Sequence, residues 1–162
     1  MRILRYPIDL VPIRCEIVDS FDDGLRQTVA HMLDVLRRSR GDGISAPQVG
    51  VNKRILAVDP KEDGRGLTVM VNPRALWTSR ELSLEHESCL SIPSVLIPLK
   101  RPSWIEVEHQ TVMGEKVTAV FGGWTARLIQ HELDHLDGLV MLDHLDDFER
   151  DLIRDCCTPS KQ

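Results

Sequence analysis

The sequence predicts one domain, residues 1–162, that combines helices with antiparallel strands. Three observations support this class: an amphipathic helical stripe over about 22–40, a hairpin formed by two β-rich runs at 104–109 and 116–121, and an apolar helix over about 124–138. A chain of 162 residues has ordinary single-domain length and can bury about 68–70% of its unfolded surface.

Each further element follows from local sequence. Pro7 and Pro12 indicate an extended segment over 1–20, and the glycines and proline of 41–50 exclude a regular helix there. Residues 54–58 and 67–71 are β-rich, and Pro73 is expected to end the second of these strands. A last helix is expected over 145–156.

Composition narrows the function classes. The hydrophobic fraction of 42% and charged fraction of 28% are typical of a globular protein, and a net charge of −5 without a basic stripe disfavours a nucleic-acid partner. No apolar run approaches the roughly 20 residues that span a bilayer, and the N-terminus lacks a signal peptide, so we expect no membrane association and a cytoplasmic location. The cysteines form no disulfide framework, and three of them are expected to be free thiols: Cys15, Cys156 and Cys157.

The segment His131-Glu132-Leu133-Asp134-His135 carries the chemistry. Two histidines four residues apart share one helix face, within reach of one metal ion, and Glu132 can exchange a proton with a metal-bound water. This pattern predicts a metal-dependent hydrolase that needs a third ligand. His144 and Asp143 are downstream candidates, but Cys89 is the better one, and its thiolate would suit iron(II), zinc, cobalt or nickel.

Three segments in order resemble the signature motifs of the peptide deformylases, and the resemblance covers nearly the whole chain. They are Gly41-Asp42-Gly43-Ile44-Ser45-Ala46-Pro47-Gln48, Glu87-Ser88-Cys89-Leu90-Ser91 and Gln130-His131-Glu132-Leu133-Asp134-His135. The resemblance implies a small α+β fold in which antiparallel sheets pack around a central helix that carries both histidines. It also implies a hydrolase that removes the formyl group from the N-terminal formylmethionine of new proteins and releases formate.

The resemblance assigns roles residue by residue. It implies that Cys89, His131 and His135 bind one divalent ion, usually Fe²⁺, with Zn²⁺, Ni²⁺ or Co²⁺ as substitutes, and that Cys89 and His131 also border the substrate. Glu132 would be the general acid and base. The oxyanion would be stabilised by the Gln48 side-chain amide and the Leu90 backbone N–H, and the peptide groove would be lined by Gly43 and Ile44. The implied partners are N-formylmethionyl peptides or nascent chains, with at most weak ribosome association by a monomer or homodimer.

Several positions depart from the family's usual pattern. Ile44 and Ser45 stand where the family usually has Leu-Ala, and the Ser45 hydroxyl is expected to bond to nearby backbone. Ser88 replaces a glycine before the metal-binding cysteine and would be strained if that position requires a positive φ. Leu96 lies about where many members have a substrate-binding arginine.

Three alternatives to a deformylase of formylmethionine stay open. The chain could be a paralogue that hydrolyses another formamide or amide, an endopeptidase with a downstream third ligand, or a binding module with a structural metal. Gln48 and Glu132 argue against the binding module, because a structural site needs neither residue.

Overall fold

The computed structural model describes residues 2–10, 12–61, 64, 66–150 and 153. Its elements are helices, short 3-10 turns (η) and strands. In chain order they are α1 (Asp23–Ser39), β1 (Gly43–Ser45), η1 (Ala46–Val49), β2 (Ile55–Val58), β3 (Thr68–Thr78), β4 (Leu82–Cys89), β5 (Ile92–Pro102), β6 (Trp104–Gln110), β7 (Lys116–Gly122), α2 (Gly123–Leu136) and η2 (Met141–His144).

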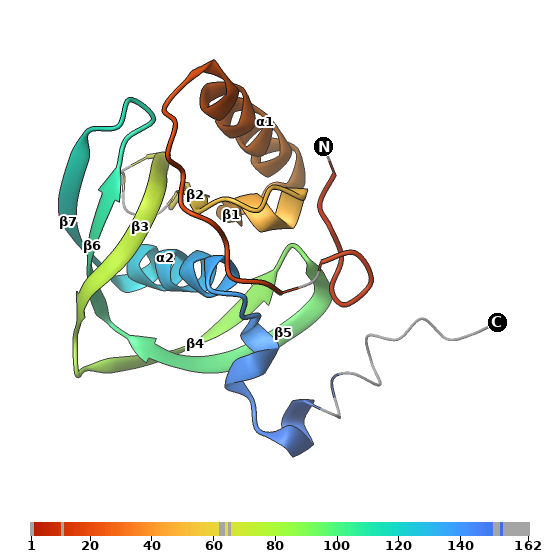
Figure 1. Ribbon diagram of the computed structural model, residues 1–162. Helices are drawn as coiled ribbons and strands as arrows, with labels where there is room; N and C mark the ends of the chain where they lie inside the picture. Colours follow the sequence, from red (N-terminus) through yellow and green to blue (C-terminus); the bar gives the residue numbers. More distant parts are fainter. Residues whose placement is uncertain (1, 11, 62–63, 65, 151–152, 154–162) are drawn as a thin grey trace.

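The strands form two antiparallel sheets. The five-stranded sheet has the order β1-β2-β3-β6-β7, and β4 pairs with β5 in a separate two-stranded sheet. Helix α2 lies in the middle of the molecule, between β1 and β2 on one side and β5 on the other (Figure 1). The predicted α+β class, with sheets around a central histidine-bearing helix, is therefore confirmed.

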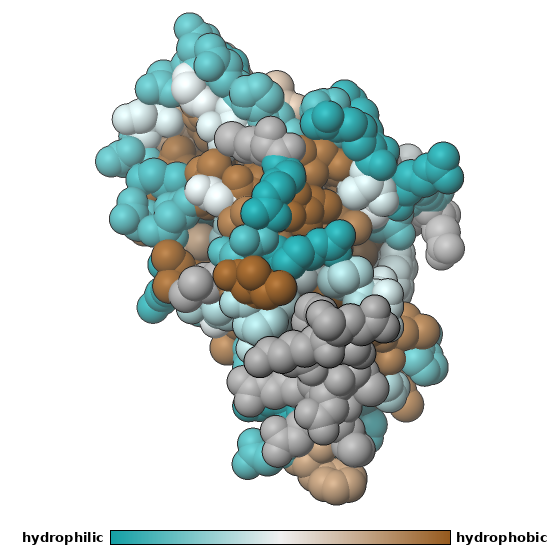
Figure 2. Space-filling view, turned by 90° about the vertical axis from the view of Figure 1, so that its right-hand side faces the viewer, coloured by the Kyte–Doolittle hydropathy of each residue, from teal (hydrophilic) through white to brown (hydrophobic). Residues whose placement is uncertain are grey.

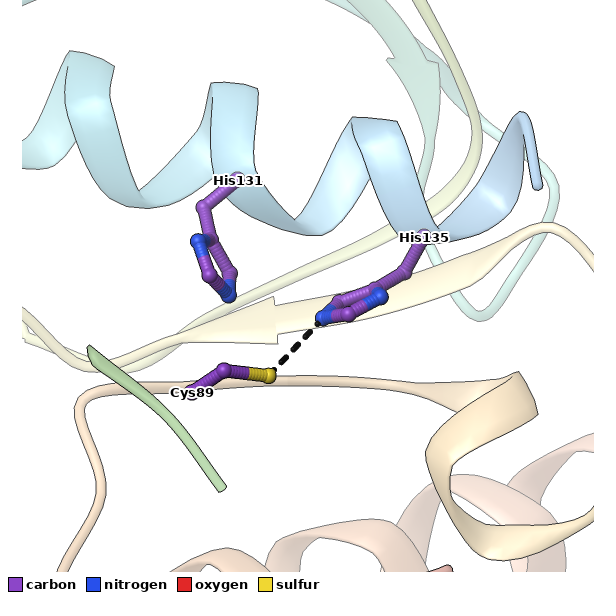
Figure 3. A group of neighbouring side chains, drawn as sticks. All are labelled: Cys89, His131 and His135. Carbon is purple, nitrogen blue, oxygen red and sulfur yellow. Dashed lines mark hydrogen bonds between the residues drawn. The ribbon is translucent and has the colours of Figure 1, made fainter. Parts of the chain in front are cut away.

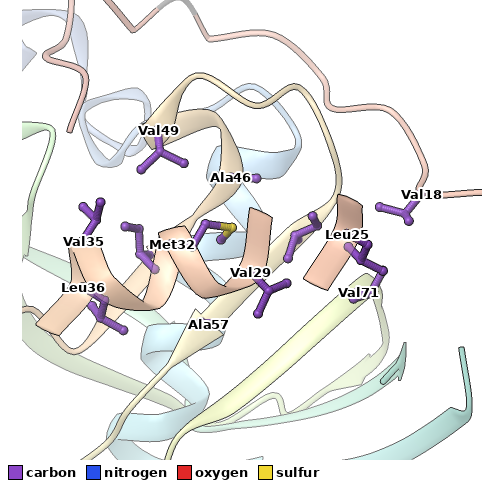
Figure 4. Packing of buried hydrophobic residues seen from close by; sticks show 12 residues of the cluster. Val18, Leu25, Val29, Met32, Val35, Leu36, Ala46, Val49, Ala57 and Val71 are labelled. Atoms are coloured by element: carbon purple, nitrogen blue, oxygen red, sulfur yellow. The ribbon is translucent and has the colours of Figure 1, made fainter. Parts of the chain in front are cut away.

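Helix α1 has the predicted position because its ends are capped. The Asp22 side chain accepts a hydrogen bond from the backbone N–H of Leu25 at 3.1 Å, and Arg40 ends the helix in the left-handed conformation with φ 57°. Its apolar stripe packs on β1, η1, β2 and the start of β3 (Figure 4). This packing forms one wall behind the segment that holds Gly43 and Gln48.

The prediction that Pro73 ends its strand is wrong. β3 continues to Thr78, and its pairing with β6 shifts register between Val71 and Arg74. Asn72, with φ 52°, and Pro73 occupy this β-bulge, where a residue without a backbone N–H is tolerated.

Strand β5 was not predicted, because it contains three prolines: Pro93, Pro98 and Pro102. It pairs with only one neighbour in the described structure. A proline can therefore lie where its nitrogen, which has no hydrogen to donate, faces away from that neighbour. The predicted last helix lies partly outside the described residues, as do Cys156 and Cys157; residues 147–150 and 153 of it are helical.

No helix in the described part of the chain is both long enough and apolar enough to cross a bilayer.

The face shown in Figure 2 carries an apolar area in its upper half that is crossed and bordered by hydrophilic residues.

Candidate active site

Helix α2 and the end of β4 bring three potential ligands together. His131 and His135 project from α2 toward Cys89 (Figure 3), and one ligand atom from each residue lies within 4.8 Å of the others. Cys89 Sγ is 3.3 Å from His135 Nε2, and the two imidazole rings lie 5.0 Å apart, nearly perpendicular. All three side chains are buried, so this is a preformed cluster of one thiol and two imidazoles.

The turn after β4 places Cys89. Leu90 and Ser91 link β4 to β5, and the strand pairing shifts register between Glu87 and Cys89. Ser88 is not among the described residues with a positive φ, so its predicted strain is absent. Its exposed side chain instead lies at the wall of the pocket beside the cluster.

Charge around the cluster favours a thiolate. Burial alone would raise the pKa of the Cys89 thiol, but hydrogen bonds and charge from His131 and His135 outweigh burial and lower it to about 5. The pKa of His131 is raised well above its ordinary value: burial lowers it, and the bonds to Cys89 and Glu87 more than compensate. A thiolate ligand is the form that binds a metal ion.

Glu87 orients the first histidine, a role that we did not predict. Its Oε2 lies 3.0 Å from His131 Nδ1, while its two oxygens also bind Arg101 at 2.6 and 2.9 Å and Arg127 at 2.6 Å. Burial would raise the pKa of Glu87, but the bonds from His131 and Arg101 hold it well below its usual range. By occupying Nδ1, the carboxylate leaves His131 Nε2 as the ring nitrogen for a metal.

The sequence contains a signal for this group. Glu87 precedes Cys89 by two residues, which places both on one face of a strand, and Arg127 precedes His131 by four residues on one face of a helix. From these spacings one could have predicted that Glu87 and Arg127, the charged residues near the second and third motifs, meet in the folded protein.

The downstream ligand candidates have other partners. His144 Nε2 lies 2.7 Å from Asp134 Oδ2, and the Asp143 side chain accepts a hydrogen bond from the backbone N–H of Val140 at 2.8 Å. Neither residue joins the Cys89 cluster among the described residues. The geometry therefore favours the upstream cysteine over a downstream third ligand.

Glu132 lies beside the cluster with unused hydrogen-bonding capacity. It is buried, and its Oε2 is the one buried side-chain polar atom without a hydrogen-bond partner among the described residues. Burial raises the pKa of its carboxyl above the ordinary value, against the opposing charges of His131 and His135. A carboxyl whose pKa lies closer to neutral is suited to general acid–base work.

Gly43 is adjacent to this carboxylate. A Cβ at position 43 would lie 2.5 Å from Glu132 Oε1, a separation that requires one of the two groups to move. A glycine there allows the backbone of β1 to approach the carboxylate closely.

Gln48 faces the cluster from η1. Its Nε2 lies 3.6 Å from Cys89 Sγ and 3.2 Å from Ser91 Oγ. Its Oε1 accepts hydrogen bonds from the backbone N–H of Ser45 at 2.9 Å and the Ser45 hydroxyl at 3.1 Å. The prediction that the Ser45 hydroxyl bonds to backbone is wrong, because it bonds to this side chain.

A pocket of about 230 Å³ opens beside the cluster. Five predicted site residues line it: Gly43, Gln48, Leu90, His131 and Glu132. The Ile44 side chain is fully buried in the core, so only its backbone could meet a ligand. β1 is an edge strand of its sheet and could offer that backbone. Leu96 is exposed on β5 and does not line this pocket.

These residues fit one divalent ion. One thiolate and two imidazoles form a three-ligand set that leaves a position open for catalysis, and the unpaired Glu132 Oε2 lies beside it. The structure describes no fourth protein ligand, which a closed structural site would require.

Comparison with known proteins gives a consistent result. The sequence profile of the polypeptide deformylase family matches residues 1–151. The chain is 36% identical to a peptide deformylase of Thermotoga petrophila over 141 residues, 87% of this chain and 84% of that protein. It is 35% identical to peptide deformylase 1B, chloroplastic, of Oryza sativa over 148 residues, 90% of this chain and 55% of the rice protein.

Solved structures agree. The crystal structure of Arabidopsis thaliana peptide deformylase 1B has a TM-score of 0.88 at 34% identity, covering 96% of this chain and 87% of that one. The peptide deformylase of Plasmodium falciparum has a TM-score of 0.86 at 31% identity, covering 94% and 91%. The likeness thus extends over sequence and fold together.

Proposed function

The chain belongs to the polypeptide deformylase family, and we propose that its Cys89–His131–His135 centre hydrolyses the formamide of N-formylmethionyl peptides and nascent chains, releasing formate. The observation that supports this assignment most strongly is the convergence of the three buried ligand groups beside Glu132, whose Oε2 has no hydrogen-bond partner in the described structure. The whole chain would act as one catalytic domain.

Cys89, His131 and His135 would hold the ion. A bound divalent ion supplies Lewis acidity, which makes a water acidic near neutral pH and polarises a carbonyl. The family resemblance makes ferrous iron the proposed native ion. Zinc, nickel or cobalt are the proposed substitutes, since a ligand set of one thiolate and two imidazoles accepts all four.

Glu132 would move the proton. Its Oε2, which has no other partner in the described structure, accepts a proton from the attacking water and later delivers it to the amine that leaves the formyl carbon. This is one carboxyl serving first as base and then as acid, so its raised pKa supports both steps.

Gln48 and Leu90 would stabilise the negative oxygen that develops on the formyl group. Gln48 Nε2 lies on the Cys89 side of the pocket, and Leu90 occupies the turn directly after Cys89. Loss of one such donor typically costs about 10²–10³ in rate.

The substrate peptide would lie along the open edge of β1. Gly43 and the backbone of Ile44 offer extended groups for pairing, and the pocket holds the first side chain between Leu90, Trp124 and Leu128. A formyl carbon carries only hydrogen beside its oxygen, so a tight pocket would favour formyl over bulkier acyl groups.

The test combines metal analysis with activity on one anaerobic preparation. The proposal predicts close to one iron per chain and formate release from a formyl-Met peptide. A substrate panel then separates the alternative, a paralogue acting on another formamide, which the named relatives do not favour. Hydrolysis of small formamides without hydrolysis of formyl-Met peptides, by fully loaded protein, would overturn the proposal. Cytoplasmic location, weak ribosome association and a monomeric or homodimeric state stay predictions.

A further inference from the structure

The orientation of the Gln48 amide is fixed at its oxygen end. The backbone N–H of Ser45 can only donate, so the Gln48 atom 2.9 Å from it must be the carbonyl oxygen, Oε1. The amide nitrogen therefore faces Cys89 and Ser91. Gln48, Ser45 and Ser91 are almost fully buried, so water does not compete for these bonds.

The Ser45 hydroxyl adds a second bond at the same end. Its oxygen lies 3.1 Å from Gln48 Oε1, and because a carbonyl only accepts, the hydroxyl donates its single hydrogen there. Two donors on Oε1 draw electron density toward that oxygen and make the N–H groups at Nε2 stronger donors. An alanine at position 45 would keep the backbone bond and lose the hydroxyl bond.

We propose that Ser45 is a positioning residue for deformylation: its hydroxyl holds and polarises the Gln48 amide, so that Nε2 is presented to the oxygen of the formyl group. The inference rests on the proposed function of Gln48 as an oxyanion donor. The family usually has alanine at this position. The proposal gives Ser45 a role in the chemistry that acts through Gln48, without contact with substrate.

A purely structural role is the competing explanation. Ser45 is also the N-cap residue of η1, so its loss could lower stability alone. A structural role lowers the melting temperature without a selective loss in kcat. A positioning role lowers kcat, leaves KM and metal content unchanged, and disappears when Gln48 is removed.

The experiment is a double-variant cycle measured on metal-loaded protein with a formyl-Met peptide. Ser45→Ala should lower kcat about 3- to 10-fold with KM within about twofold, the size expected for one buried neutral hydrogen bond. Ser45→Thr, which keeps a hydroxyl, should recover most of the loss. Ser79→Ala is the matched control, because it removes a hydroxyl with two hydrogen bonds far from the cluster and should leave kcat unchanged.

Repeating the substitution in a Gln48→Ala background tests whether Ser45 acts through Gln48. There, adding Ser45→Ala should change kcat by less than about twofold, since the hydroxyl no longer has an amide to act on. An equal loss in both backgrounds would overturn the proposal, as it would place the effect on Glu132 or on the fold. An unchanged kcat in Ser45→Ala would overturn it too.

A readout that is independent of activity separates this inference from the function. In ¹⁵N-labelled, zinc-loaded protein, the Gln48 side-chain amide signals are identified by their loss in Gln48→Glu. Ser45→Ala should shift them well beyond any change in Ser79→Ala, and signals that stay in place would overturn the inference. Wild-type protein that is fully metal-loaded but releases no formate would overturn the proposed function alone.

Discussion

Glu87 Oε2 lies 3.0 Å from His131 Nδ1, so one buried carboxylate connects the imidazole of a proposed metal ligand to the guanidinium groups of Arg101 and Arg127. Arg101 also binds Asp134 at 2.8 Å on the helix that carries both histidines. The network ties β4, β5 and α2 together at the point where the cluster forms.

Glu87→Gln is expected to weaken metal binding. The substitution keeps the size of the side chain but removes the charge that two buried arginines and His131 share, and loss of such a supporting partner typically lowers metal affinity about 10- to 100-fold. Competition with a chelator measures the affinity. Glu85→Gln, an exposed glutamate on the same strand, is the control and should bind metal like the wild type. Equal affinities for Glu87→Gln and Glu85→Gln would contradict the assigned role.

Cys89→Ala should abolish stoichiometric metal binding, whereas His144→Ala should retain it. Cys89 lies in the ligand cluster and His144 pairs with Asp134 instead. Metal analysis after gel filtration gives the ratio of ion to chain. Cys15→Ala provides a matched control, as it removes another buried cysteine outside the cluster. Metal retention in Cys89→Ala would favour a third ligand downstream, as in an endopeptidase.

Gly43→Ala is expected to lower kcat while the metal stays bound. The added Cβ would meet Glu132 Oε1 at 2.5 Å and push the carboxylate from its place, and its three nearest atoms all belong to Glu132, which is outside the Cys89–His131–His135 cluster. Misplacement of about 1 Å at a reacting group can cost about 100-fold in rate. Gly24→Ala in α1, far from the cluster, is the control. Wild-type kcat in Gly43→Ala would mean that the carboxylate tolerates displacement.

Cys15 should react slowly with iodoacetamide in the native protein at pH 8. Burial raises the pKa of this thiol above its ordinary value, so the thiolate fraction at pH 8 is smaller than for a free cysteine, and the side chain is also shielded. Mass spectrometry of the Cys15 peptide measures the modified fraction over time. Unfolding in urea should restore ordinary reactivity, and equal rates in native and unfolded protein would refute the expectation.

The elements with strong periodicity and caps could be predicted from the sequence. α1 and α2 lie where their apolar stripes placed them, and the spacing of His131 and His135 brought both rings to one face. Cys89 is 42 residues from His131, so only its chemistry and the family resemblance could join it to them.

The missed features depend on contacts between distant segments. Pro73 fits into β3 because a bulge receives it, and β5 tolerates its prolines because it pairs on one side. Glu87 has no partner within its own strand; Arg101 and Arg127 come from β5 and α2. The hydrogen bond from Ser45 to Gln48 spans only three residues, yet nothing in the sequence distinguishes it from a bond to backbone.

Formate release by wild type and Glu132→Gln, each with its metal content measured, tests the central claim most directly. The account predicts that loaded wild type releases formate from a formyl-Met tripeptide and no acetate from the acetyl-Met counterpart. Glu132→Gln should keep the ion, because Glu132 is outside the ligand set, and lose about 10²–10⁴ in kcat with its proton transfer. Near-wild-type activity of loaded Glu132→Gln, or no formate from loaded wild type, would contradict it.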